Sequence, residues 1–328
     1  MFSKIFSCFF YFSRLLSLAL LSCLMCSSVF ASPQTGKGYE LKDLGSGVYF
    51  LSDGSYNTMF VVSDQGVIVV DPLPSLGHKY QEAIAEVTSQ TVTHIIYSHE
   101  HLDHIGAAYL FPADAKIIAH ENTRILLDEA HDPRRPVPDI SFRKTYHLHV
   151  GNQSLELQFS SENHTAGNIF IYLPRQKILM LVDVIYPAYA PYPNLGVATN
   201  IGGLIVVNKK ALDYDFKEFV GGHVGQPGSR KDVETSLIFL EDLEKTARQV
   251  LSEKTFTHYL KSRSETDTKS TWFAHDDYEN DRVAACYAQL LPVWDKRLLG
   301  LHRSLKSHCW TMIMSLAISL PSAPNSSP

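Results

Sequence analysis

The segment YSHEHLDHIG at residues 97–106 places four side chains that can bind a first-row metal within six positions. They are His99, His101, Asp103 and His104. Imidazole nitrogens and carboxylate oxygens are ligands that zinc and its neighbours accept. His99 and His101 have strand spacing, whereas the adjacent Asp103 and His104 must point in different directions. The pattern favours a loop that supplies ligands to two metal positions over a solvated histidine-rich loop.

Three further residues of the same chemistry stand at the ends of predicted strands or in adjoining turns. His164 lies in ENHTAGN, and Asp183 ends the run KILMLVD, which is too apolar for an unpaired carboxylate. His223 lies in FVGGHVG, where glycines allow a tight turn. Taken alone, each could be a capping histidine, a strand-end aspartate or a loop histidine. Beside the first motif, they indicate a complete ligand set.

The order HxHxDH, single His, Asp, final His resembles that of the metallo-β-lactamase-fold hydrolases. The resemblance covers about residues 40–250 and includes the contexts VVDP, SHEHLDH, HTAGN, LVD and GGH. It implies an α/β (α+β) fold: an αββα sandwich of two mixed β-sheets flanked by helices. The site is then expected at the edge where the two sheets meet. Helical sequence after this region predicts a C-terminal helical extension.

The resemblance also implies a role for each residue. One metal ion is expected to be bound by His99, His101 and His164. A second is expected to be bound by Asp103, His104 and His223, with Asp183 bridging the two. Asp71, at the end of VIVVD, is expected to orient the metal-binding turn through hydrogen bonds without ligating. Val182 stands where many relatives have glycine, which should change packing and leave ligation intact.

The ligand set predicts two zinc ions per chain, although iron and manganese accept the same ligands. Two ions can share a hydroxide, because each lowers the pKa of bound water towards about 7. That hydroxide would attack a carbonyl carbon, with Asp103 and Asp183 partly neutralising the metal charge. Tyr186 matches a tyrosine that polarises the carbonyl in the lactonases of this fold. The alternative is that Tyr186 is one more aromatic residue in a loop with Tyr189 and Tyr192.

The favoured function is an exported dinuclear zinc hydrolase that cleaves an ester, lactone, thioester or amide bond of a small molecule. A glyoxalase-II-like thioesterase shares all seven ligands and usually adds a helical domain. A β-lactam hydrolase usually has another residue at the bridging position, and an iron-dependent persulfide dioxygenase uses only part of the set. A non-catalytic periplasmic metal-binding protein is the fourth alternative. Arg134 and Arg135 in DPRRPVP could meet a substrate carboxylate, but a solvated loop is favoured.

The chain is expected to divide into four parts. Residues 1–31 have the apolar core and Val-Phe-Ala end of a secretory signal peptide, which places the protein in the periplasm or outside the cell. A retained membrane anchor and lipidation at Cys23 are less favoured alternatives. The expected metal-binding domain covers 39–253, the helical extension covers 254–318, and a disordered tail covers 319–328.

The formal charge, the apolar segments and the cysteines of the mature chain limit the classes of partner that it could bind. Removal of the signal peptide takes away Lys4 and Arg14 and changes the formal charge from −5 to −7. That charge argues against nucleic-acid binding. No second stretch is long and apolar enough to span a membrane. Cys286 and Cys309 remain, either as a disulfide or as two buried thiols. The oligomeric state is not predicted by any motif.

Hydrophobic periodicity predicts strands and helices in alternation. Strands are expected at 47–53, 58–64, 67–72, 93–98, 116–120, near 142–150 and 153–160, and in a hairpin over 168–183. A last strand leads to His223. Helices are expected at 76–89, 103–111, 121–130, about 203–215, about 229–253 and within 255–318.

Overall fold

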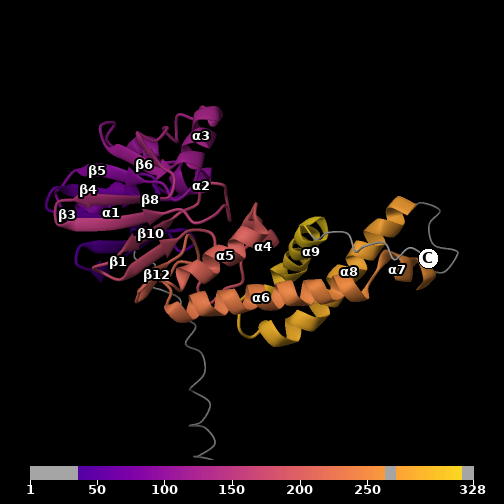
Figure 1. Cartoon of the computed structure of the whole chain (residues 1–328). Coiled ribbons are helices and arrows are strands. Elements are labelled where there is room, and N and C mark those ends of the chain that lie inside the picture. Colours follow the sequence, from indigo (N-terminus) through magenta and orange to yellow (C-terminus); the bar gives the residue numbers. More distant parts are fainter. Residues whose placement is uncertain (1–35, 263–270, 320–328) are drawn as a thin grey trace, which may run out of the picture. The chain divides into compact units, whose positions relative to one another are not determined.

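The computed structural model describes residues 36–262 and 271–319. From Gly38 onward these residues belong to one unit, whose helices and strands are labelled in Figure 1. The predicted signal peptide lies outside the described residues, as does all of the predicted tail except Ser319. Among the described residues, no helix combines the length and apolar character needed to cross a membrane.

The first of two sheets has seven strands in chain order. Neighbours pair antiparallel from the first strand to the fourth and parallel from the fourth to the seventh, so the sheet is mixed. The strands are β1 (Glu40–Gly45), β2 (Val48–Ser52), β3 (Asn57–Ser63), β4 (Gly66–Val70), β5 (Val92–Ile96), β6 (Lys116–His120) and β7 (Ile140–Phe142).

The second sheet has five strands in the order β12-β11-β10-β9-β8. Only the pair β11 and β12 is parallel, so this sheet is mixed as well. Its members are β8 (Thr145–Val150), β9 (Gln153–Gln158), β10 (Phe170–Leu173), β11 (Ile178–Leu181) and β12 (Glu218–Val220).

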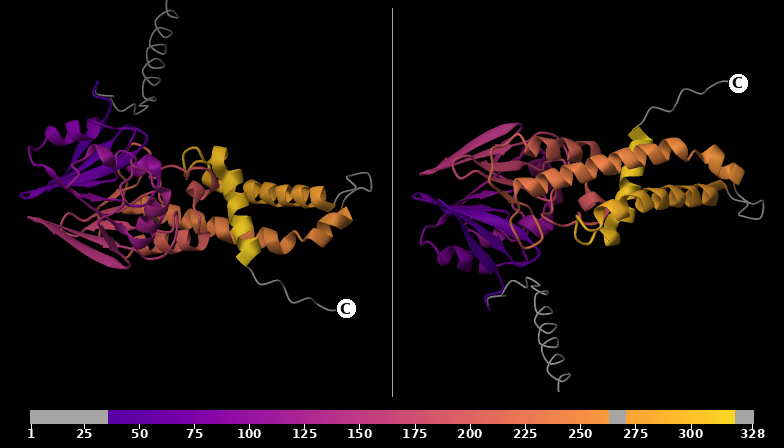
Figure 2. Two further views of the ribbon diagram at one scale, coloured as in Figure 1. Left: turned by 90° about the horizontal axis from the view of Figure 1, so that it is seen from above. Right: turned by 90° about the horizontal axis from the view of Figure 1, so that it is seen from below.

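The two sheets pack face to face with helices on both outer sides (Figure 2). Strand β4 shows why: Ile68 and Val70 enter the core between the sheets, whereas Val67 and Val69 face the outer helical layer. Alternate residues of a strand point to opposite faces, so an all-apolar strand must be buried on both sides. The predicted αββα sandwich is confirmed.

Helices form the outer layers and the C-terminal region. On the first sheet lie α1 (Lys79–Ala85) and α3 (Glu121–Ala130), and the short α2 (Leu102–Ile105) and η1 (Ala108–Leu110) follow β5. The remaining helices are α4 (Pro193–Val197), α5 (Ile201–Ala211), α6 (Arg230–Glu253), α7 (Phe256–Ser262), α8 (Thr271–Trp294) and α9 (Leu301–Ser319). One core on the second sheet includes side chains from α5, α6, α8 and α9, and the predicted boundary at 253/254 stays a prediction.

A disulfide joins Cys286 of α8 to Cys309 of α9. Both cysteines are fully buried, and both helices pack against α6. Of the two states predicted for this pair, the structure has the bonded one. The cross-link therefore ties α9 to α8.

Three features differ from the sequence-based expectation, and the first is β1, a strand at Glu40–Gly45 where none was expected. The expected strand near 142–150 is two strands that belong to different sheets, β7 and β8, and Arg143 and Lys144 between them carry the chain across. The segment α4 was expected to be loop and is a left-handed turn, with φ of 58° at Asn194, 56° at Leu195 and 70° at Gly196. Non-glycine residues in this conformation cost about 1–2 kcal/mol each, so neighbouring structure must hold the turn.

The double substitution Cys286→Ala and Cys309→Ala should lower the free energy of unfolding by about 2–4 kcal/mol, because the bond closes a loop over a sequence separation of 23. Urea unfolding followed by circular dichroism measures the change. Oxidised wild type is the control, and reduced wild type should match the variant. An unchanged urea midpoint would contradict a stabilising role for the disulfide.

Candidate metal centre

All seven predicted ligands lie at one edge of the sandwich, in the segments that follow strands β5, β9, β11 and β12, and Asp103 and His104 are part of the short helix α2. The turn after β5 carries His99 and His101 and continues into α2. The loop after β9 carries His164. Asp183 and His223 follow β11 and β12, which are parallel neighbours and therefore end at the same edge. The fold thus brings together segments that are up to 124 residues apart in the chain.

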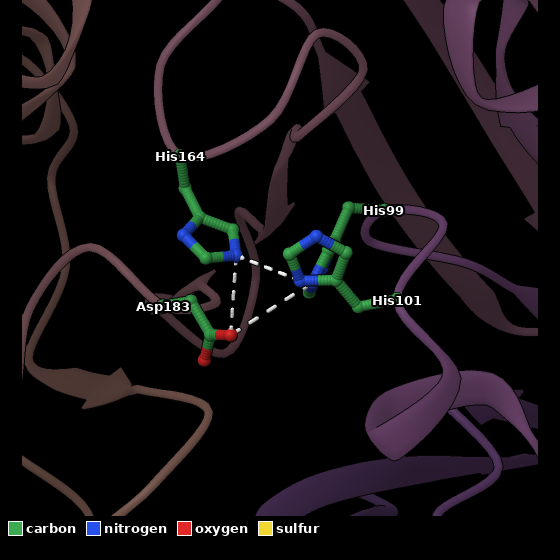
Figure 3. Close-up of side chains that lie close together, drawn as sticks. All are labelled: His99, His101, His164 and Asp183. Carbon is green, nitrogen blue, oxygen red and sulfur yellow. Dashed lines mark hydrogen bonds and ion pairs between the residues drawn. The ribbon is translucent and has the colours of Figure 1, made fainter. Parts of the chain in front are cut away.

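The first cluster consists of His99, His101, His164 and Asp183 (Figure 3). Potential ligand atoms of these residues lie within 4.8 Å of one another. His164 Nε2 is 3.1 Å from His101 Nδ1 and 3.4 Å from Asp183 Oδ2, and His99 Nε2 is 3.8 Å from that same oxygen. Three imidazoles and a carboxylate therefore face one small volume.

The second cluster consists of Asp103, His104 and His223, whose ligand atoms also lie within 4.8 Å of one another. His104 Nε2 is 3.8 Å from Asp103 Oδ2 and 3.1 Å from Asp183 Oδ2. His223 Nε2 is 3.0 Å from Asp183 Oδ1. Asp183 therefore contacts histidines of both clusters, which is the position expected of a shared ligand.

The donor atoms fit a pair of bound metal ions. His99 Nε2 is buried and has no hydrogen-bond partner among the described residues, although buried polar atoms are nearly always paired. The ring nitrogens of His101 and His164 approach each other, and two lone pairs at 3.1 Å repel unless a proton or a cation lies between them. Five histidines and two aspartates are the donors that zinc and neighbouring metals accept. The clusters fit a dinuclear metal site.

Electrostatics keep Asp183, His99 and His164 in the states that bind metal. At His104 burial lowers the pKa, but the Asp183 carboxylate outweighs burial and raises it to about 9, so this ring must release a proton to become a ligand. Burial raises the pKa of Asp183, but the charges of His104 and His164 and the hydrogen bonds from His104 and His223 outweigh burial, so the pKa lies well below its usual value. Burial lowers the pKa of His99 well below its ordinary value and that of His164 to about 4. A neutral imidazole and an ionised carboxylate are the ligating forms.

One glycine makes room for the shared carboxylate. A Cβ at Gly222 would lie 2.5 Å from Asp183 Oδ1 and 3.0 Å from His104 Cε1. Any side chain here would displace a ligand. The motif GGH is therefore explained by close packing as well as by the turn that presents His223.

Asp71 supports the metal-binding turn through two hydrogen bonds from Ser98. Its Oδ1 accepts a hydrogen bond from Ser98 N at 2.7 Å, and its Oδ2 accepts one from Ser98 Oγ at 2.6 Å. Ser98 Oγ lies 2.9 Å from His99 Nδ1, which directs the opposite ring nitrogen towards Asp183. Asp71 is fully buried, and burial raises its pKa to about 6. This geometry matches the expected orienting role.

A second set of contacts that supports the metal-binding turn was not predicted from the sequence. Glu100, between the first two histidines, accepts a hydrogen bond from Thr165 Oγ1 at 3.0 Å, so it links the turn to the residue after His164. Arg135 Nη1 donates to the Glu100 carbonyl at 2.6 Å and Arg135 Nε to Asp132 at 3.1 Å. Arg134 remains exposed, as expected for a solvated loop, whereas Arg135 holds the turn. No spacing rule identifies such a bond.

Two tyrosines flank the second cluster. Tyr186 is buried, its ring is stacked on His223 with centroids 5.8 Å apart, and burial raises its pKa well above the ordinary value, so its hydroxyl is neutral. Tyr56, which was not predicted, lies 4.6 Å from His223 and 5.6 Å from His104 between ring centroids. Burial and then the Asp103 carboxylate raise the pKa of Tyr56. Tyr56 lies in a turn, and no sequence motif indicates that its ring packs against His104 and His223.

An open groove of about 350 Å³ lies beside His223. Tyr189 and Tyr192 are 40% and 66% exposed there, so the aromatic faces are available to a ligand. No lysine, arginine, aspartate or glutamate is among the described residues that line the groove, which are Gly54, Ser55, Tyr186, Tyr189, Ala190, Tyr192, His223 and Val224. The groove beside His223 is therefore aromatic and uncharged.

Comparisons with known proteins agree with this arrangement. The family model described as "Metallo-beta-lactamase superfamily" matches residues 51–247. The chain is 28% identical over 54% of its length to the 2,4-dinitroanisole O-demethylase subunit alpha of Nocardioides sp., of which the match covers 55%. It is 28% identical over 30% of its length to the hydroxyacylglutathione hydrolase of Mesorhizobium japonicum, of which the match covers 36%. The chain spans about half the length, or less, of these curated relatives.

Solved structures show the same fold. A metallo-beta-lactamase from Pontibacter korlensis superposes with a TM-score of 0.54 at 22% identity, over 62% of this chain and 99% of that one. The superposition takes in almost all of that chain. The remainder of this chain lies beyond that comparison.

Two separable metal positions predict different losses for two substitutions. His101→Ala should remove mainly the metal of the first cluster and His223→Ala mainly that of the second, because they belong to different triads. Elemental analysis should find about one metal ion per chain in His101→Ala and in His223→Ala. The control is His147→Ala, at an exposed position of β8, which should keep about two. One ion or none in the wild type would overturn the dinuclear assignment.

Proposed function

Because the chain belongs to the metallo-beta-lactamase superfamily, whose members are mostly metal-dependent hydrolases, we propose that it is a dinuclear zinc hydrolase. Its substrate is a small molecule with an ester, lactone, thioester or amide bond. The observation that carries this proposal is the position of Asp183, which contacts histidines of both clusters at 3.0–3.8 Å.

When bound, the two metal ions supply acidified water and an electrophile that polarises a carbonyl oxygen. The protein contributes charge, orientation and proton transfer. The Asp103 side chain is 48% exposed, so this carboxylate can pass a proton between water and the leaving group. The bond from the carbonyl carbon to oxygen, sulfur or nitrogen breaks, the hydroxyl of water goes to carbon, and the proton goes to the departing atom. The neutral Tyr186 hydroxyl is a donor for a carbonyl oxygen.

The groove favours an uncharged substrate with an aromatic or apolar substituent. Tyr189 and Tyr192 offer faces on which a flat group can stack, which contributes about 0.5–1.5 kcal/mol beyond area burial. A glyoxalase-II-like thioester of glutathione brings two carboxylates, and no lysine or arginine is among the described residues that line the groove to receive them. A neutral acyl compound therefore fits this surface better than a glutathione conjugate.

O-demethylation of an aryl methyl ether is a second candidate. It is supported by the similarity to the 2,4-dinitroanisole O-demethylase subunit alpha and by the aromatic groove. β-Lactam hydrolysis, iron-dependent persulfide oxidation and non-catalytic metal binding remain alternatives. Elemental analysis and a panel of neutral esters, lactones, thioesters, a β-lactam, a persulfide and an aryl methyl ether would separate them.

Export to the periplasm or beyond is part of the proposal. The disulfide between Cys286 and Cys309 supports it, because such bonds persist in oxidising compartments. N-terminal sequencing of the mature protein would test cleavage after Ala31.

Asp183→Asn keeps the shape of the side chain and removes the charge that both clusters share. Hydrolysis should fall by about 10²-fold or more, on the scale of losing a principal electrostatic stabiliser. Activity is measured on the best substrate from the panel, together with metal content. Full activity with both metals retained would show that Asp183 is only a structural strand-end residue.

Tyr186→Phe is the matched test of the hydroxyl. It should reduce kcat about ten-fold, because one neutral donor is lost while the ring contact with His223 is kept. Metal content should stay at the wild-type value. A kcat equal to that of the wild type on every substrate would assign Tyr186 to packing alone.

A further inference from the structure

The left-handed turn of α4 is held by helix α9, beside which it lies (Figure 1). Asn194 N donates to Ser307 Oγ at 2.9 Å, and Leu195 N donates to His308 Nδ1 at 3.1 Å. Consecutive left-handed residues point their amides to one side. Two side chains of α9 therefore receive the amides of a backbone conformation that non-glycine residues rarely adopt.

The other side of this turn touches the metal centre. A Cβ at Gly196 would lie 2.8 Å from Tyr186 Oη and 3.2 Å from the Asp183 carbonyl. Farther along, Thr199 N donates to the His164 carbonyl at 3.0 Å. The segment from 194 to 199 thus joins α9 to the backbone of two expected ligands and to the hydroxyl of Tyr186.

Helix α9 is itself firmly anchored. The disulfide joins Cys309, next to His308, to α8. The His308 side chain is fully buried, and burial lowers its pKa to about 4, so the ring is neutral and Nδ1 can accept a hydrogen bond. Burying a histidine side chain costs more free energy than burying an apolar side chain at the same position, even when one ring nitrogen accepts a hydrogen bond from a backbone amide. Its orientation points to a role beyond filling the core.

We propose that His308 and Ser307 are positioning residues of the active site. By holding the left-handed turn, they keep Gly196 against Tyr186 and so set where the hydroxyl meets the substrate. The C-terminal helices are then a part of the catalytic unit, and they act through the loop without contacting substrate. The expected effect on kcat rests on the proposed hydrolytic function, whereas the expected effect on the hydrogen exchange of the loop does not.

The test compares His308→Leu, which removes the acceptor, with His308→Asn, whose side-chain oxygen can replace Nδ1. Hydrogen exchange of a peptide covering 186–200 should be about ten-fold faster in His308→Leu and near the wild-type rate in His308→Asn. Peptides from β3 and β4 serve as the internal control and should not change. Ser307→Ala, at a partly exposed position, removes the other acceptor without opening the core and should act in the same direction.

On the best substrate, kcat of His308→Leu should fall about ten-fold with both metals retained, because a displaced donor loses alignment with the carbonyl. His308→Asn should restore the rate. Exchange of 186–200 at the wild-type rate in both His308→Leu and Ser307→Ala would overturn the inference, whether or not any substrate is turned over. Faster exchange with no activity in any protein, wild type included, would instead count against the proposed function alone.

Discussion

A carboxylate buried among apolar strands is costly unless positive charge lies close to it. Asp183 follows the fully buried β11, and four histidine nitrogens lie within 3.8 Å of its oxygens, where they would hold the cations that compensate its charge. These histidines come from three segments, and each segment ends or follows a strand at the same edge of the sandwich. The two sheets must pack in register for this charge to be compensated. The site therefore exists only where these segments meet at one edge of the folded sandwich.

Strained backbone is concentrated at this edge. Asp71 and Asp183 both have positive φ, at 37° and 60°, and Val224 after His223 has a φ of 76°. Non-glycine residues in such conformations persist only where the surroundings fix them, and they cluster at functional sites. The hydrogen bonds from Ser98 to Asp71 and the contacts between Asp183 and the histidines offset that strain. The left-handed turn beside Tyr186 belongs to the same pattern, since helix α9 holds it from outside.

The sequence predicted the elements whose signal is local or strongly patterned. The strands β3, β4 and β6 and the helix α6 follow from apolar periodicity, and the seven ligand positions follow from residue type and order. Local patterns missed what depends on contacts between distant residues. The bond from Arg135 to the Glu100 carbonyl and the packing of Tyr56 on His223 leave no periodic trace. The run near 142–150 looked like one strand, because alternation within a strand does not reveal that the chain changes sheets at Arg143. The proposed substrate preference rests on the exposed faces of Tyr189 and Tyr192, which only the packed loop defines.

The central claim is that Asp183 lies between two metal ions. Anomalous X-ray diffraction at the zinc absorption edge, on crystals of the mature protein purified with zinc, tests it directly. We expect two anomalous peaks about 3.5–4 Å apart, one on each side of the Asp183 carboxylate. A single peak, or two peaks that leave Asp183 bound only to protein groups, would contradict the account.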